Sequence, residues 1–185
     1  MRDLQTLIFG ISGFLCLAFS GVVRSDQMMP VSIEQLGEQS QLILHGTVLS
    51  KSCQRDDAGR IYTQVALQVA EVWKGAIAAN PFTLVHGGGM LGDKRVLVSN
   101  QVDFQIGEEV VAFLVLNQRG EGVCLGLAQG KFHVWVEPGT KRKLARNPFH
   151  GGPASAASGA QMDQPAPDQR LTLSELQRRV QGAKQ

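Results

Sequence analysis

The longest regular pattern in the chain is the stretch RIYTQVALQVAEVWKG, which runs from Arg60 to Gly75. In its first part, apolar or β-branched residues occupy every second position: Ile61, Thr63, Val65, Leu67 and Val69. This period of two predicts a strand with one buried face. At Glu71 the phase changes, which indicates a β-bulge or strong coiling in a long, bent strand. A small closed barrel requires long bent strands, so this stretch favours a barrel.

Shorter segments with strand character surround this long one, and Gly, Asn or Asp separates them. They are Leu42–Ser50, Pro81–His86, Arg95–Ser99, Glu109–Asn117, Val123–Ala128 and Lys131–Val136. Many short strands with frequent turns are typical of a sandwich or a barrel. The sequence therefore predicts an all-β fold, a small closed or partly open barrel.

Two short helices are predicted outside the strands. Ser32 and Gln35 form a capping-box pattern that begins the first helix. Thr172 and Glu175 repeat the pattern at the start of the second, which spans residues 171–182. The result is a barrel with a short N-terminal helix and a C-terminal helix after a disordered linker.

The N-terminus has the features of an export signal. Arg2 precedes an apolar run from Leu7 to Val23, and small residues suited to cleavage follow at Ser20 and Ser25. Cleavage after Ser25 is the preferred interpretation, which makes residues 1–25 a signal peptide. Cleavage after Ser20 and an uncleaved anchor remain alternatives. The expected location is periplasmic or extracellular, with no stable membrane insertion after cleavage.

The rest of the chain divides into a domain and a tail. Residues 26–140 form the predicted barrel domain, and residues 141–170 form a predicted flexible linker rich in Gly, Ala, Ser, Pro and Gln. The basic cluster KRKLAR, Lys141 to Arg146, lies at this boundary. We interpret it as a solvated segment in preference to a binding patch.

Export gives the cysteines a structural meaning. Cys53 and Cys124 are an even pair in the expected mature chain, and an oxidising compartment favours a disulfide between them. Two unpaired, buried thiols are the alternative. Cysteines this far apart in the sequence give no metal-binding signature.

Charge and histidine spacing exclude several classes of function. Eighteen basic and sixteen acidic residues leave a net charge of +2, which predicts no strong attraction to nucleic acid. The histidines are scattered and form no metal-ligand motif, so we expect neither a metal nor a cofactor. His45 and His133 lie in strand patterns, where a single imidazole is usually structural.

The stretch FTLVHGGGMLG, Phe82 to Gly92, resembles the HGGG oxyanion-hole loop of esterases. The chain has no G-x-S-x-G nucleophile motif and no alternation of strands and helices, so we reject that interpretation. We predict instead that residues 85–93 form a mobile surface loop that contributes to partner binding. The candidate binding residues are Gly87, Gly88, Gly89, Met90 and Leu91.

A family resemblance lies in three segments. Leu42–Val48 resembles the first strand, and Tyr62–Gly75 the long coiled strand, of the netrin-like domains, which include the tissue inhibitors of metalloproteinases. Ile106–Leu116, a Gly-Glu turn leading into an apolar strand, adds to the likeness. Gly126–Phe132 is similar to a segment of secreted bacterial proteins with this layout. The resemblance implies an OB-like barrel.

The resemblance does not carry over the inhibitory mechanism. The metalloproteinase inhibitors place a cysteine at the mature N-terminus, where it grips the catalytic zinc, whereas this chain offers Asp26 or Gly21. We therefore expect an exported, non-catalytic module that engages a secreted protein, with a protease as one candidate, through barrel loops. A module for an envelope glycan or small ligand is an alternative, for which exposed aromatic residues would be the cue. Trp73 and Trp135 lie in strand patterns and are predicted to be core. An enzyme with an unrecognised site is the third class.

Overall fold

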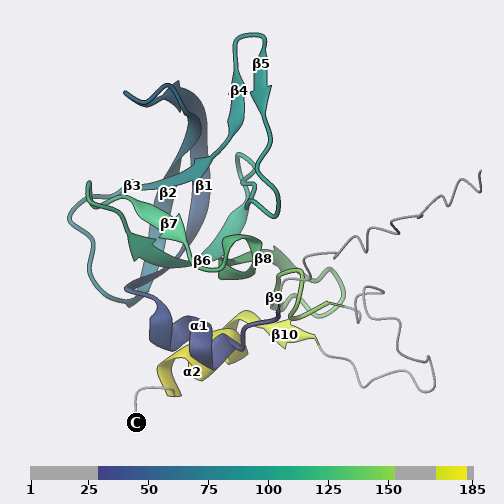
Figure 1. Cartoon of the computed structure of the whole chain (residues 1–185). Helices are drawn as coiled ribbons and strands as arrows, with labels where there is room; N and C mark the ends of the chain where they lie inside the picture. The colour runs from purple at the N-terminus through teal and green to yellow at the C-terminus, as the bar shows by residue number, and fades with distance from the viewer. Residues whose placement is uncertain (1–28, 153–169, 183–185) are drawn as a thin grey trace, which may run out of the picture.

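A computed structural model describes residues 29–152 and 170–182. The predicted signal peptide and residues 153–169 of the predicted linker lie outside these ranges. The elements are α1 (Ile33–Gln39), β1 (Leu42–Arg55), β2 (Ile61–Lys74), β3 (Phe82–Gly87), β4 (Gly89–Leu91), β5 (Lys94–Val96), β6 (Glu109–Leu116), β7 (Gly122–Cys124), the 3-10 helix η1 (Leu127–Gly130), β8 (Lys131–Val136), β9 (Lys143–Arg146), β10 (Leu171–Thr172) and α2 (Leu173–Gly182). The predicted all-β fold with a short helix towards each end is confirmed (Figure 1).

Five of the strands close into a ring. They hydrogen-bond in the order β1, β2, β3, β7 and β6, and β6 returns to β1. The strand β1 closes the ring because residues 42–47 pair with β6 on one edge while residues 43–55 pair with β2 on the other. On the far side, β3 and β7 run parallel and meet at Leu84 and Gly122. This ring is a small, partly open β-barrel.

The β1–β2 pair bends through three irregularities. Its register shifts leave Trp73, Ala70 and Leu49 as extra residues without a direct partner. Two of these positions flank Glu71, where the sequence pattern changed phase, so the predicted bulge is confirmed. Gly46 lies in this bend, where an added Cβ would come within 2.3 Å of the carbonyl oxygen of Gln68. The two backbones approach this closely only because Gly46 has no side chain.

The first half of β1, Leu42–Val48, and most of β6 bury both faces, which explains why these segments are mostly apolar. Leu42 and Leu44 point into the barrel, whereas Ile43 between them points outward into a second core. The barrel core consists of Leu42, Leu44, Val48, Val65, Leu67, Val69, Leu84, Val102, Phe104, Val110, Ala112, Leu114 and Cys124. The second core consists of Ile33, Leu36, Ile43, Trp73, Val111, Phe113, Phe132, Val134, Ala145, Leu171, Leu176 and Val180.

Both helices cover the second core and contact each other at the end of the molecule opposite the β4–β5 hairpin (Figure 1). Gly37 of α1 packs against Val180 of α2, and Arg179 makes two hydrogen bonds with Glu34, at 2.7 and 3.1 Å. The hydrogen bond from Arg179 lowers the pKa of Glu34 below its ordinary value. The N–H of Glu175 donates to the Thr172 hydroxyl, as the capping pattern predicts.

Three sequence boundaries are corrected. The predicted strand Arg95–Ser99 is the shorter β5, and the predicted strand Val123–Ala128 ends at Cys124, because Gly126 adopts a φ of 61° and turns the chain into η1. The predicted linker 141–170 contains a strand, β9, which pairs with both β8 and β10. Only Leu144 and Ala145 of β9 are buried. Because the residues around them are basic, the sequence pattern did not indicate a strand here.

The docked position of α2 predicts a stability effect. Leu176 is fully buried, so Leu176→Ala should lower the free energy of unfolding by about 2–5 kcal/mol in a denaturant titration. Arg178→Ala changes an exposed residue of the same helix and serves as the control. Equal stabilities for the two variants would contradict the docking of α2 on the sheet.

Candidate binding site

The open end of the barrel, opposite the helices, carries a row of three polar side chains. Cys53 of β1 pairs directly with Thr63 of β2, and Thr63 pairs directly with His86 of β3. Residues paired in this way project from the same face of a sheet, with Cβ atoms about 5 Å apart. The inward alternation of β2 that predicted Thr63 to face the core therefore also places Cys53 and His86 on that face.

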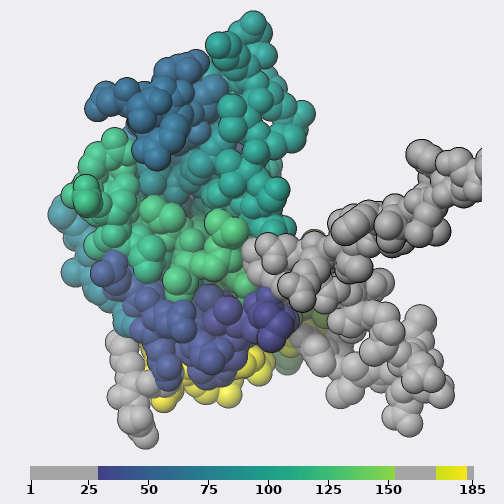
Figure 2. All heavy atoms as spheres, viewed as in Figure 1, coloured from purple at the N-terminus to yellow at the C-terminus, as the bar shows by residue number. Residues whose placement is uncertain are grey.

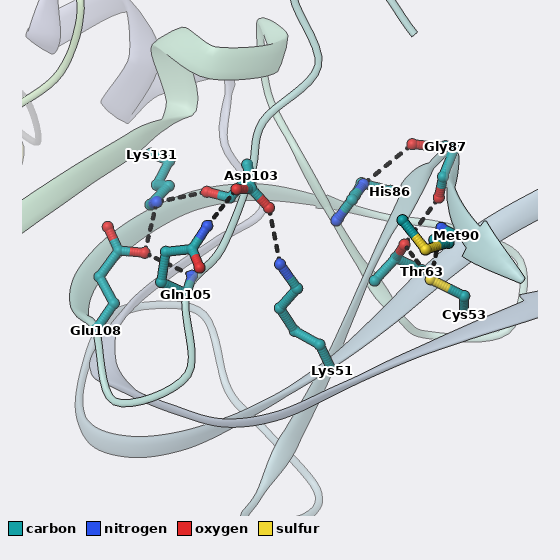
Figure 3. Close-up of polar contacts among 11 residues, drawn as sticks. Lys51, Cys53, Thr63, His86, Gly87, Met90, Asp103, Gln105, Glu108 and Lys131 are labelled. Carbon is teal, nitrogen blue, oxygen red and sulfur yellow. Dashed lines mark hydrogen bonds and ion pairs between the residues drawn. The ribbon is translucent and has the colours of Figure 1, made fainter. Parts of the chain in front are cut away.

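A chain of hydrogen bonds ties this row to the next strand (Figure 3). The Met90 N–H donates to Cys53 Sγ at 3.3 Å, and Thr63 Oγ1 donates to the carbonyl oxygen of Gly88 at 2.8 Å. Because the single hydroxyl proton of Thr63 is used there, the 3.4 Å contact between Cys53 and Thr63 needs the thiol as donor. With the Cys53 S–H donating to Thr63, each of these polar groups has a hydrogen-bond partner.

The glycine run fits tightly over this row. Gly89 has a φ of 136°, and an added Cβ would lie 2.5 Å from both Cys53 Sγ and Thr63 Oγ1. Gly88 has a φ of 77°, and its Cβ would lie 2.6 Å from the carbonyl oxygen of Val96. Gly87 has more space, with a side-chain methyl of Val98 at 3.4 Å as the nearest atom. Gly88 and Gly89 are therefore required by close packing and by backbone conformation.

The prediction of a surface loop over residues 85–93 is wrong. Its first three residues end β3, and residues 89–91 form β4, which pairs with β5 in a hairpin that projects from the barrel (Figures 1 and 2). The Gly88 N–H donates to the carbonyl oxygen of Ile61, which continues the sheet up to the hairpin. This arrangement could not be predicted from the sequence alone, because Cys53 and Thr63, which contact Gly89, lie on the distant strands β1 and β2.

Apolar side chains gather on the hairpin and the segment after it. Leu97 is 77% exposed and Met90 61% exposed, and Val96 and Val98 are also exposed. Leu91, another predicted binding residue, is half-buried. Lys94 and Arg95 lie between Leu91 and Val96 and are exposed as well. The hairpin thus exposes apolar and basic side chains on both of its faces: Met90 lies opposite Arg95 on one face, and Leu91 lies opposite Lys94 on the other.

His86 is held in one tautomer. Its Nδ1 lies 3.0 Å from the carbonyl oxygen of Gly87, so Nδ1 carries the proton and donates, which leaves Nε2 as an acceptor. Nε2 is buried, and no described residue hydrogen-bonds to it. The ring stacks on Phe104 with centroids 6.2 Å apart. Burial lowers the pKa of His86, and the positive charges of Lys51 and Lys131 act in the same direction.

Two ion pairs lie to one side of the histidine (Figure 3). Lys51 Nζ lies 2.8 Å from Asp103 Oδ1, and Lys131 Nζ lies 2.7 Å from Glu108 Oε2. Lys131 also donates to the backbone carbonyl of Asp103. Burial alone would raise the pKa of Asp103, but the hydrogen bond and charge of Lys51 hold that pKa below its ordinary value. Sequence analysis missed these four residues, because the pairs join segments distant in the chain.

Two backbone amides at the glycine run are already engaged as hydrogen-bond donors. The N–H of Gly88 donates to Ile61 and that of Met90 to Cys53 Sγ, so both amides already have acceptors. Among the described residues, no hydrogen bond joins Cys53 to His86, and Thr63 stands between them in the sheet. The arrangement is suited to holding the hairpin in place and to presenting its surface.

The predicted disulfide is absent, because Cys53 and Cys124 are both free thiols. Cys124 pairs with Leu114, which pairs in turn with Leu42 at the start of β1. Cys53 lies near the other end of β1, on the order of 35 Å away along the strand. A disulfide needs Cα atoms within about 7 Å, which this separation exceeds despite the bend of β1. Burial raises the pKa of the Cys124 thiol to about 12.

Three other residues, His45, Trp73 and Trp135, were predicted to have structural roles within the fold. His45 is buried, and its Nε2 lies 2.6 Å from Glu109 Oε1, as expected for a histidine within the fold. Trp73 is core, as predicted. The prediction for Trp135 is wrong: it is half-buried on the outward face of β8, because Phe132 and Val134 occupy the inward positions of that strand.

No protein-family model matches the chain, and no curated protein matches it. Within residues 29–152 and 170–182, no group of three or more His, Cys, Asp or Glu residues is placed to hold a metal ion. In that part of the chain, no helix is long and apolar enough to cross a membrane.

The two thiols should differ in reactivity. Iodoacetamide should modify Cys53 in the native protein faster than Cys124, which is buried and has a raised pKa. Peptide mass mapping after native and denaturing alkylation measures the difference, with Cys53→Ser as the control. Recovery of a Cys53–Cys124 linked peptide under non-reducing conditions would contradict the free-thiol arrangement.

His86 predicts a pH-dependent stability. Its folded pKa lies below the ordinary value of 6.5, so between these two values the unfolded chain binds more protons than the folded chain. The free energy of unfolding should therefore fall as pH decreases through 6.5, and this part of the fall should be missing in His86→Gln. Denaturant titrations between about pH 5 and 7.5 measure the difference. The same pH dependence in both proteins would refute the assignment.

Proposed function

We propose that the chain is an exported, non-catalytic binding module that engages a secreted protein through the β4–β5 hairpin and the segment that follows it. The observation that carries this proposal is the anchored hairpin: Gly88 and Gly89 pack against the barrel, while Met90 and Leu97 remain exposed to solvent. An isolated two-stranded hairpin is marginally stable in water, so its attachment to the barrel row is what lets it project. Grouped apolar side chains on a protein surface commonly mark an interaction site.

The edge of the hairpin adds to this proposal. The strand β5 pairs with β4 and, within the described residues, with no other strand, so its second edge is free. Such an edge can accept an extended segment of a partner through backbone hydrogen bonds. Lys94 and Arg95 lie on β5, and their charge discourages pairing with a second copy of the same strand. The partner surface suited to this hairpin is therefore an apolar segment of another protein.

The expectation of export and the family resemblance specify the partner class. The apolar run at the N-terminus supports secretion of this chain. The likeness to the netrin-like domains supports a secreted protein as its partner, with a protease as one candidate. The contact would differ from that of the metalloproteinase inhibitors, because neither candidate mature N-terminus of this chain is a cysteine. Binding through the hairpin requires no zinc ligand.

A site-specific photo-crosslinker tests this proposal in the secreted fraction of the native host. Placed at Leu97, on the hairpin side, it should give a discrete adduct. The same crosslinker at Arg178, exposed on α2 at the other end of the molecule, should give none. Leu97→Asp should abolish capture of the crosslinked partner, whereas Leu116→Asp, a matched change at another exposed leucine, should preserve it. Equal adducts at both positions, or none at Leu97, would refute the proposal.

A further inference from the structure

The outward face of β8 and β9 carries a second surface, which the hairpin proposal does not use. In β8, Phe132 and Val134 enter the second core, so His133 and Trp135 point away from it. His133 pairs directly with Arg146 of β9, and Trp135 lies diagonally across from Arg146. These three residues, His133, Trp135 and Arg146, form the β8–β9 platform.

Stacking contacts order the platform. The rings of His133 and Trp135 are nearly parallel, at 9°, with centroids 5.8 Å apart. The guanidinium carbon of Arg146 lies 5.2 Å from the centre of the Trp135 ring, within the range of a cation–π contact. His133 Nδ1 also lies 3.0 Å from Glu108 Oε1, and Glu108 is held in turn by Lys131. The tryptophan is therefore placed by its neighbours in a fixed position, beside Leu144, its direct partner in β9, which is the buried apolar residue of the same face.

Apart from Glu108, which contacts His133 and is paired with Lys131, the charged residues near the platform are mainly basic. Arg146 and the nearby Lys141 and Arg142 are exposed, and none of them forms an ion pair with a carboxylate in the described part of the chain. The one acidic residue of the preceding turn, Glu137, is bonded to Arg170 and Thr140. Such a concentration of positive charge beside an ordered aromatic ring is complementary to a ligand with a flat apolar face and an anionic group.

We propose that the β8–β9 platform binds an acidic polysaccharide. The C–H face of a sugar ring packs against Trp135, and the acid group of the sugar receives the guanidinium of Arg146, with Arg142 available to a neighbouring sugar. Single-stranded nucleic acid fits less well, because its successive bases stack on several aromatic side chains, whereas this face has one tryptophan. The net charge of +2 also gives little general attraction to a nucleic-acid backbone.

Binding of the purified chain to defined polymers tests this inference. Polygalacturonate carries carboxylates and dextran sulfate carries sulfates, so the two distinguish the acid group. Neutral dextran and oligo-deoxythymidine are the comparison ligands. We expect at least one acidic polysaccharide to bind more tightly than neutral dextran and than the oligonucleotide. Arg146→Gln should weaken that binding about tenfold, the effect of one charge-assisted hydrogen bond.

Two further variants keep the test decisive. Arg178→Gln removes the same charge from an exposed position on α2 and should change the affinity by less than about twofold. Trp135→Leu should weaken the part of the binding that persists at high salt, where screening removes most of the electrostatic contribution. Melting temperatures identify any variant that fails to fold. Equal weakening by Arg146→Gln and Arg178→Gln, tighter binding to the oligonucleotide, or no binding to either acidic polymer would overturn the inference.

Discussion

The double pairing of β1 is the constraint on which the rest of the structure depends. Residues 43–46 hydrogen-bond to β2 on one edge and to β6 on the other, which closes the ring. The bend that this requires brings Gly46 so close to the carbonyl of Gln68 that no side chain fits between them. Closure then separates an inner core from an outer one, because alternate residues of β1 and β6 enter different cores.

Closure also gives the molecule two unlike ends (Figure 1). At one end, α1 and α2 cover the outer core, and the pair Glu34–Arg179 joins the helices. At the other end, the row Cys53, Thr63 and His86 remains available to hold a projecting hairpin. The same sheet therefore supplies stability at the helical end and presents apolar side chains at the open end.

The fold was predictable where its signals are local. The alternation in β2 and its phase change at Glu71 predicted a bent strand with a bulge, and the pattern of Thr172 and Glu175 predicted the start of α2. The site was predictable only in part, because its contacts join distant segments. The glycine run was identified, but its partners Cys53 and Thr63 could be assigned only from strand register. Strand register also places Cys53 far from Cys124. The disulfide was predicted from the expected export and the even number of cysteines, and neither contains information on that distance.

The central claim is that the glycine run fixes the hairpin to the barrel by close packing. Amide hydrogen exchange at Gly88 and Met90 tests this most directly, because these amides donate to Ile61 and to Cys53 Sγ. Both amides should exchange slowly in the native chain and in Gly87→Ala, where the added methyl has space. Both should exchange fast in Gly89→Ala, where it would meet Cys53 and Thr63. Exchange in the native chain at the rate of an unstructured peptide, or unchanged protection in Gly89→Ala, would contradict the account.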